Sequence, residues 1–141
     1  MSLLEQVLEH NPKTVKIVFK NFPIRSHNFA VNAALAALAA DRQGKFWEFH
    51  DELFKNHNQL NEEKVQQIAA ELKLDKGQFE KDRRDPLMLE MVKDDVNQGI
   101  EAGVNSVPTV FVNGRRLKQR SLDGFQELID KELKNLKIIK P

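Results

Sequence analysis

The sequence predicts an α/β protein in which a long run of helices separates two short β-rich segments. Three observations support this fold class. Val15–Phe19 is rich in β-branched residues and contains one polar side chain, which suits a strand that is covered on both faces. Residues between about 27 and 102 repeat apolar side chains at helical spacing. Thr109–Val112 is a second β-branched run, and it ends in the hairpin signal Asn113-Gly114.

Composition bounds the class of protein before any motif is considered. The chain has 141 residues, a net charge of +1 and 30% charged residues. These values describe one ordinary domain and give no electrostatic attraction to nucleic acid. No stretch approaches the roughly 18 apolar residues of a membrane span, and Met1–Glu5 lacks the features of a signal peptide. The sequence also lacks a Gly-rich phosphate loop, and we expect no cofactor.

The first element is a short amphipathic helix over Leu3–His10, which ends at Asn11-Pro12. Because so few residues form no secure independent helix, the segment is predicted to be the tail of a longer one. The Val15–Phe19 strand follows, and Asn21-Phe22-Pro23 breaks it. Ser26 then suits the N-cap of an Ala-rich helix that runs toward Gln43-Gly44.

Four further helices are predicted before the second β segment. The first of them runs from about Lys45 to Asn56, and Asn61 caps the next. A short helix opens at Leu74-Asp75-Lys76. Asp85-Pro86 places a capping side chain before a proline at the first helical position, so a long helix is predicted from there to Ala102.

The last third of the chain is predicted to contain a constrained loop, a hairpin and a final helix. Gly103 can adopt the left-handed conformation that closes a helix, and Pro108 pushes Val107 out of the helical region. Thr109–Val112 pairs through the Asn113-Gly114 turn with a short strand near Arg115–Leu117. A helix from Ser121 to about Leu136 completes the chain.

Three ordered segments resemble the DsbA-like thiol:disulfide oxidoreductases, which have a thioredoxin fold. They are Lys20-Asn21-Phe22-Pro23, Gln43-Gly44-Lys45-Phe46-Trp47-Glu48-Phe49-His50 and Val107-Pro108-Thr109-Val110-Phe111-Val112-Asn113-Gly114. The resemblance covers essentially the whole chain. It implies a single partial thioredoxin-like domain over 1–141, with a helical insertion at about 27–102. It also implies a cis-proline loop at Val107-Pro108.

The chain departs from that family in having no cysteine. Disulfide exchange needs a thiolate nucleophile, so the chain is expected to be redox-inactive and to have no catalytic residue. The resemblance places a strand and a Cys-x-x-C helix before Leu3–His10, so we expect an N-terminally truncated domain. The missing strand would lie between Val15–Phe19 and Thr109–Val112. We expect these two segments to pair directly, or a second copy of the chain to fill the gap by swapping or strand addition.

The function that the resemblance implies is that of the C-terminal portion of a protein disulfide oxidoreductase or isomerase. Its clients would be extended or unfolded proteins, held by Ser106, Val107 and Pro108. The resemblance also implies a periplasmic or other extracytoplasmic location. Two alternatives remain open. One is a non-catalytic peptide-binding or chaperone-like module, and the other is a structural homodimer.

The aromatic residues near Phe46 and the histidines His50 and His57 could form binding or metal sites, or could have only structural roles. Most of the aromatic residues Phe46, Trp47, Phe49 and Phe54 share one helical stripe and are predicted to be core, with Trp47 as the exception. His50 and His57 are seven residues apart, which does not match the H-E-x-x-H zinc spacing, so no metal site is expected.

A basic cluster beside the hairpin has two interpretations. Its members are Arg115, Arg116, Lys118 and Arg120. One interpretation is contact with phosphate or an acidic partner. The other is that charged residues on a short edge strand discourage edge-to-edge aggregation, and the low net charge favours it. We therefore predict no nucleic-acid partner.

Overall fold

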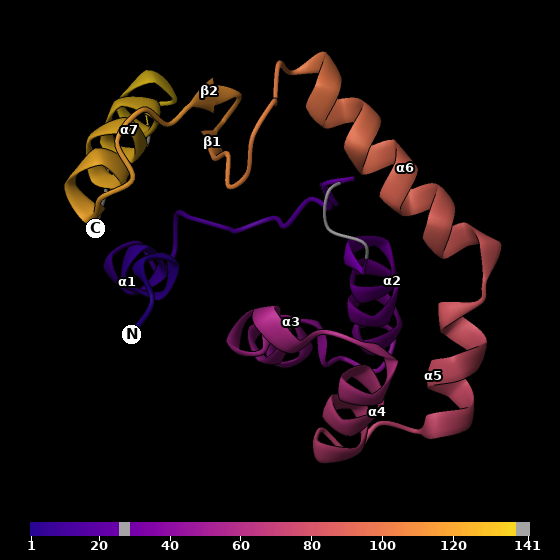
Figure 1. Cartoon of the computed structure of the whole chain (residues 1–141). Coiled ribbons are helices and arrows are strands. Elements are labelled where there is room, and N and C mark those ends of the chain that lie inside the picture. Colours follow the sequence, from indigo (N-terminus) through magenta and orange to yellow (C-terminus); the bar gives the residue numbers. More distant parts are fainter. Residues whose placement is uncertain (26–28, 138–141) are drawn as a thin grey trace. The chain divides into compact units, whose positions relative to one another are not determined.

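The computed structural model describes residues 1–25 and 29–137, and it divides the chain into two compact units (Figure 1). The first unit joins Met1–Phe19 to Val104–Pro141, and the second is Lys20–Gly103. The predicted insertion at about 27–102 falls within the second unit.

The described elements follow the predicted order closely. They are α1 (Leu3–His10), α2 (Ala30–Asp41), α3 (Phe46–Lys55), the short helix η1 (His57–Gln59), α4 (Glu62–Glu71), α5 (Lys76–Arg83), α6 (Pro86–Glu101), β1 (Phe111–Val112), β2 (Arg115–Arg116) and α7 (Leu122–Asn135). The expected N-cap at Ser26 lies outside the described residues.

Side-chain caps set the starts of several helices where the sequence predicts them. Asn61 accepts a hydrogen bond from the Lys64 N–H at 2.8 Å and so begins α4. Asp75 and Asp85 cap α5 and α6 in the same way, and Ser121 caps α7. Each cap satisfies a backbone donor that the first helical turn leaves without a partner.

The second unit is built around α2, which contacts α3, α4, α5 and α6 (Figure 1). Most of its residues are alanines, and their small side chains let neighbouring helices approach closely. Larger side chains from the other helices fill the core around them. Those that are most deeply buried are Phe49, Val65, Ile68 and Phe79.

An ion-pair clamp ties the end of α2 to the α5–α6 junction. Arg42 donates to the buried carboxylate of Asp82 at 2.8 Å, and its other terminal nitrogen lies 2.9 Å from Asp85. Two hydrogen bonds lower the pKa of Asp85. The larger effect comes from the Leu87 N–H and the smaller from the Arg42 side chain. At the start of the same unit, the Asn21 N–H donates to Asp95 of α6 at 2.8 Å.

The first unit consists of α1, α7 and the two-stranded hairpin, with α1 packed against α7 (Figure 1). Its apolar core contains Val7, Leu117, Phe125, Ile129 and Leu133, and Val15, Val110 and Val112 pack against it. Asn11 is buried beside this core, where its amide donates to Gln126 of α7 at 2.9 Å. These contacts hold one face of the hairpin on the two helices.

The Asn113-Gly114 turn and the helix-closing glycine are confirmed. Asn113 and Gly114 have φ values of +48° and +80°, which a two-residue hairpin turn of type I′ requires. Gly103 has a φ of +82° directly after α6. The β1–β2 pairing places Phe111 opposite Arg116 and Val112 opposite Arg115.

The predicted strand at Val15–Phe19 is wrong for the structure as described, because the segment joins no sheet among residues 1–25 and 29–137. Of the two arrangements expected for this segment, direct pairing with Thr109–Val112 is wrong for the same reason, and completion by a second copy stays a prediction. The second predicted strand is also shorter than expected, since β1 begins at Phe111. A strand exists only where a neighbour accepts and donates its hydrogen bonds, and β-propensity alone supplies none.

Two glycines in helices should respond oppositely to alanine. A Cβ at Gly124 in α7 would overlap the backbone oxygen of Gln119, whereas at Gly77 in α5 it meets only ordinary contacts. We expect Gly124→Ala to lower the free energy of unfolding by ~1–3 kcal/mol. Gly77→Ala should raise it by ~0.5–1 kcal/mol because helical glycine carries a conformational cost. Urea denaturation followed by circular dichroism checks both, and a neutral Gly124→Ala would contradict this account of the α7 start.

Candidate functional site

The loop that precedes β1 contains the three residues predicted to hold a client. Ser106, Val107 and Pro108 are all exposed, and the Val107–Pro108 peptide bond is cis. The hydroxyl of Thr109 donates to the C=O of Ser106 at 2.6 Å, so one side-chain hydrogen bond spans the loop. This bond connects the loop to the start of the hairpin.

The backbone of β1 presents an open edge beside this loop. The Leu117 N–H donates to the C=O of Val110 at 2.9 Å, which directs the backbone groups of Val110 toward the β2 side. Successive residues of a strand point their N–H and C=O groups in opposite directions. The N–H and C=O of Phe111 therefore point to the outer edge, where no described strand lies.

The exposed side chains at this edge are apolar. Val107 is 43% exposed and Phe111 is 36% exposed, whereas Val110 and Val112 face the helices. Within the described part of the chain, the Val107 backbone makes no hydrogen bond. An extended polypeptide can use such an edge by strand addition, with main-chain hydrogen bonds for affinity and side-chain contacts for selectivity.

The sequence identified the loop but missed the contribution of Phe111. The turn type and the length of β1 together determine which residues direct their backbone outward. The Asn113-Gly114 signal could have supplied that register, because a two-residue turn makes Val112 and Arg115 a hydrogen-bonded pair. Phe111 then follows as an outward-directed residue.

The loop and the outer edge of β1 offer backbone groups and apolar side chains. The chain contains no cysteine. Among residues 1–25 and 29–137, no cluster of three or more histidine and carboxylate side chains could hold a metal ion. The same described residues include no helix that is long and apolar enough to cross a membrane.

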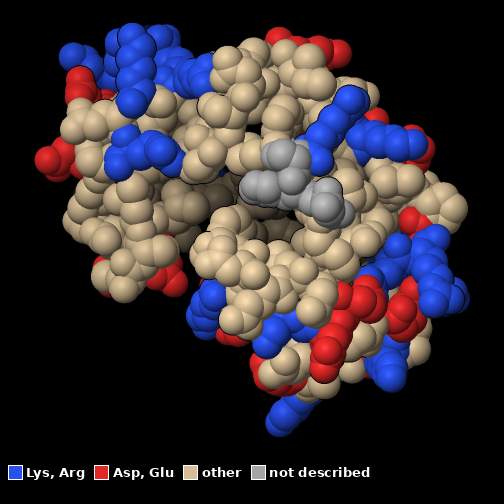
Figure 2. Space-filling view, in the orientation of Figure 1, with Lys and Arg blue, Asp and Glu red and all other residues tan. Residues whose placement is uncertain are grey.

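Two members of the basic cluster, Arg115 and Arg116, make up β2 on the opposite side of the hairpin. Arg115 forms an ion pair with Glu132 of α7, and Arg116 is exposed in β2. Figure 2 shows basic side chains gathered over the region of the hairpin and α7. Their position on an edge strand fits the protective interpretation, because lysine and arginine discourage pairing with another strand.

The aromatic residues of α3 divide between core and surface. Phe49 is fully buried, but both Trp47 and Phe54 are exposed, so the prediction that Phe54 is core is wrong. The His50 ring lies 4.6 Å from the ring of Phe54 and 5.4 Å from that of Trp47, measured between centroids. Phe54 lies at the periphery of the helical unit, where α3 meets solvent.

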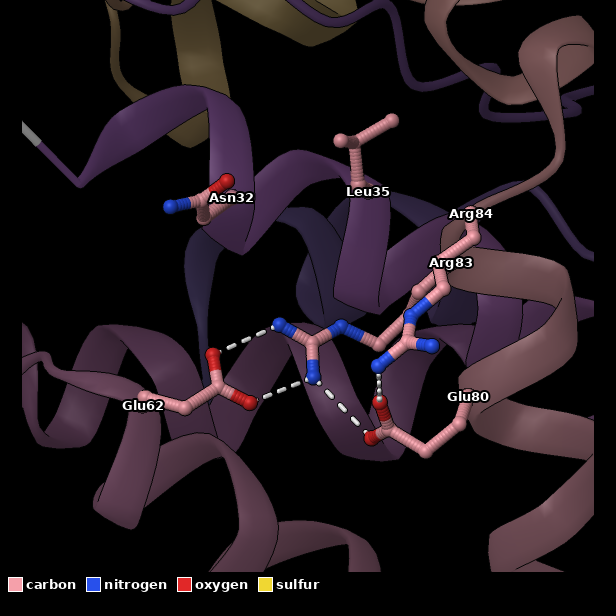
Figure 3. A pocket seen from close by; sticks show the side chains of 6 residues that line it. All are labelled: Asn32, Leu35, Glu62, Glu80, Arg83 and Arg84. Carbon is pink, nitrogen blue, oxygen red and sulfur yellow. Dashed lines mark hydrogen bonds and ion pairs between the residues drawn. The ribbon is translucent and has the colours of Figure 1, made fainter.

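A hollow of about 270 Å³ on the helical unit is the other candidate site (Figure 3). Asn32 and Leu35 line it from α2, while Glu62, Glu80, Arg83 and Arg84 contribute the charged wall. Arg83 donates two hydrogen bonds to the carboxylate of Glu62, at 2.6 and 2.7 Å. It donates a third to the carboxylate of Glu80 at 3.1 Å. Gln66 bridges both carboxylates, at 2.9 Å to Glu62 and 2.6 Å to Glu80.

The charged side chains of this hollow pair with one another, since Arg83 forms ion pairs with both Glu62 and Glu80. The hydrogen bonds from Arg83 lower the pKa of Glu62 to about 2. The hydrogen bond from Gln66 lowers the pKa of Glu80 as well. Both carboxylates are therefore ionised at neutral pH and cannot act as general acids. The arrangement joins α4 to α5, and we assign it a structural role.

The depressed pKa of Glu62 predicts a defined loss of stability in acid. Folding favours the ionised carboxylate, so its contribution is present above pH 4.5 and is lost as pH falls toward about 2. Because this side chain is 55% exposed, the contribution should be only ~0.5–1 kcal/mol. Urea denaturation of the parent chain and Glu62→Gln should show a stability difference that shrinks across this window.

Glu63→Gln is the matched control for this measurement, because Glu63 lies in the same first turn of α4. It removes a carboxylate from the same helical turn and leaves the Arg83–Glu62 pair intact, so comparison of the two variants isolates the contribution of that pair. A stability difference between the parent chain and Glu62→Gln that stays constant as the pH falls would contradict the assigned role of the Arg83–Glu62 pair.

Comparisons with known proteins agree with this geometry. The sequence matches the family described as Thioredoxin over residues 2–131. A solved thioredoxin-like oxidoreductase from Silicibacter pomeroyi superposes with a TM-score of 0.80 at 26% sequence identity. The superposition covers 94% of this chain and 76% of that one.

Curated relatives bear the names of ion antiporters. The Na⁺/H⁺ antiporter NhaA 1 of Mycolicibacterium vanbaalenii is 36% identical over 118 residues, which is 82% of this chain. The Na⁺/H⁺ antiporter NhaA of Herminiimonas arsenicoxydans is 35% identical over 109 residues, which is 77% of this chain. The chain spans only 19% and 17% of the lengths of these two proteins, so the similarity concerns a part of each.

Proposed function

Because the chain belongs to the thioredoxin family, we propose that it is the client-holding portion of a thiol:disulfide oxidoreductase. In this role it binds an extended or unfolded polypeptide at the Ser106–Pro108 loop and the outer edge of β1. The thiol pair that exchanges the disulfide is not among its residues. We propose an extracytoplasmic compartment for this activity, since disulfide exchange with clients belongs to oxidising spaces.

The observation that carries the proposal is the combination of bare backbone and apolar side chains at one place. Val107 and Phe111 both expose side chains, and both have main-chain groups without a described partner. The hydroxyl of Thr109 holds the loop at 2.6 Å from the Ser106 carbonyl oxygen. This arrangement limits the entropy that ordering the loop would cost when a client binds.

A second candidate is peptide binding without exchange, and the absence of cysteine favours it. Binding at a strand edge uses only backbone groups and apolar contacts, none of which involves a thiol. The antiporter relatives do not distinguish the two candidates, because the chain resembles only about a fifth of the M. vanbaalenii protein. Both candidates share the same client-binding surface, so one binding experiment tests that surface.

The test uses a fluorescent peptide from a reduced client whose cysteines have been alkylated, so that no thiol chemistry contributes. Fluorescence anisotropy should report saturable binding to the parent chain. Val107→Asp should weaken the affinity by about tenfold, which corresponds to ~1.4 kcal/mol. The added carboxylate places a charge against an apolar contact and beside the carbonyl oxygens of the incoming strand.

Val31→Asp is the matched control, because Val31 on α2 is also 43% exposed and lies in the other unit. It should leave the affinity unchanged. The proposal fails if the parent chain does not bind the peptide, or if the two aspartate variants weaken binding equally while both remain folded by circular dichroism.

A further inference from the structure

The segment that contains the client-binding loop and the hairpin has no acidic residue. Between Glu101 and Asp123 the chain carries basic side chains and not one carboxylate, although acidic residues make up 21 of its 141. The basic members are Arg115, Arg116, Lys118 and Arg120. This imbalance is local, since the net charge of the whole chain is only +1. The loop and the hairpin therefore form a positively charged region on a nearly neutral protein.

Only one of these basic side chains is neutralised by another described residue. Arg115 forms an ion pair with Glu132 of α7. Arg116, Lys118 and Arg120 are exposed, and none of them forms an ion pair or a side-chain hydrogen bond with residues 1–25 or 29–137. An anionic ligand can therefore pair with these side chains without displacing a carboxylate of the described chain.

The register of the hairpin places Arg115 and Arg116 on opposite faces. Arg115 lies opposite Val112, which packs on the helices. Arg116 lies opposite Phe111, so these two side chains share the other face of the hairpin. This pair does not exchange backbone hydrogen bonds, and side chains approach each other more closely at such pairs. Arg116 therefore lies beside the apolar side chain that we place in the client site.

Lys118 lies at the end of the hairpin that is nearer to the loop. The Leu117 N–H donates to the C=O of Val110 at 2.9 Å, and Val110 comes two residues after Pro108. Because the two strands run antiparallel, the chain continues from Leu117 to Lys118 in the direction of the loop. One exposed cation therefore lies toward the loop, and the other lies opposite Phe111.

We propose that the clients held at this site carry acidic side chains, and that Arg116 and Lys118 select them. This inference rests on the proposed function, because it takes the loop and β1 as the client-binding surface. A client strand at the outer edge of β1 lies two strand spacings from β2, which is about 10 Å. An arginine and a glutamate side chain together span that distance. A glutamate opposite Phe111 therefore reaches Arg116.

The mixture of cations and apolar side chains favours a polypeptide over other anionic partners. Val107 and Phe111 expose apolar groups in the same segment as the cations. An acidic polypeptide supplies apolar groups and carboxylates together, whereas a nucleic acid gains its affinity from many phosphate contacts. Sites for anionic membranes are typically clusters of about four to eight basic residues. The cations left without an ion pair here are fewer than that, namely Arg116, Lys118 and Arg120.

The test compares three fluorescent, alkylated peptides that differ only in carrying glutamate, glutamine or lysine at two alternate positions. Alternate positions place both side chains on one face of an extended chain. Fluorescence anisotropy at low salt should show that the glutamate peptide binds about fivefold more tightly than the glutamine peptide. The lysine peptide should bind most weakly. The differences should shrink at high salt, because exposed charges are then screened.

The outcomes of this comparison separate the inference from the function on which it rests. Equal affinities for the glutamate and glutamine peptides at low salt would overturn the acidic preference and leave the proposed function intact. If the parent chain binds none of the three peptides, both are overturned.

Variants of the two cations test their assigned role. Arg116→Gln combined with Lys118→Gln should remove most of the preference for the glutamate peptide. Arg116→Glu should shift the preference toward the lysine peptide, a result that general damage to the site does not produce. Lys131→Gln is the matched control, because Lys131 is exposed on α7 of the same unit and loses the same charge. A folded double variant that keeps the preference, or a folded Lys131→Gln that loses it, contradicts the assignment.

Two competitors distinguish a polypeptide from other anionic partners. A single-stranded oligonucleotide and vesicles that contain phosphatidylglycerol are each added to the complex with the glutamate peptide. Unlabelled glutamate peptide should displace the labelled one at a lower concentration of negative charge than either competitor. A competitor that displaces it at a lower concentration of charge than the peptide itself would overturn the proposal in favour of a nucleic acid or a membrane.

Discussion

The first unit depends on one constraint, which is that a strand cannot satisfy its own backbone. A helix closes its hydrogen bonds internally, but an extended segment must find a neighbour or leave its groups to water. In this chain, β1 pairs with β2. The backbone groups of Lys16, Ile17 and Val18 have no hydrogen-bond partner among the described residues. The exposed backbone of Phe111 and that of residues 16–18 have the same cause, which is the lack of a neighbouring strand among the described residues.

The described helices of the second unit are free of this constraint. Their backbone bonds lie within α2 to α6, and what remains is the packing of side chains around the alanines of α2. Charges are placed where helices end and must be joined. Arg42 connects α2 to Asp82 and Asp85, and Arg83 connects α5 to Glu62 on α4. This difference explains why the same chain has a well-packed helical unit and an incomplete sheet.

The sequence predicted the features that depend on local chemistry. Asn61 and Asp85 cap helices as expected, and Asn113-Gly114 forms the hairpin turn, because each requires only a side chain and the backbone within a few residues. Features that depend on distant segments could not be predicted in the same way. The role of Phe111 depends on the register of β1 with β2, and the exposure of Phe54 depends on where α3 lies in its unit. A helical stripe indicates which face is apolar, but not how far along the helix the core extends.

Recognition of a client and exchange of a disulfide place different demands on a thioredoxin-like fold. Exchange of a disulfide requires thiol groups, which the 141 residues lack. Holding an extended chain requires an exposed strand edge, and the hydrogen bond from Thr109 to Ser106 secures the loop beside that edge without any thiol. Client binding and disulfide exchange are thus distinct properties of the fold, because they depend on different atoms. Of the two, binding is the one that we propose for this chain, because it needs only the exposed backbone and side chains of Val107 and Phe111.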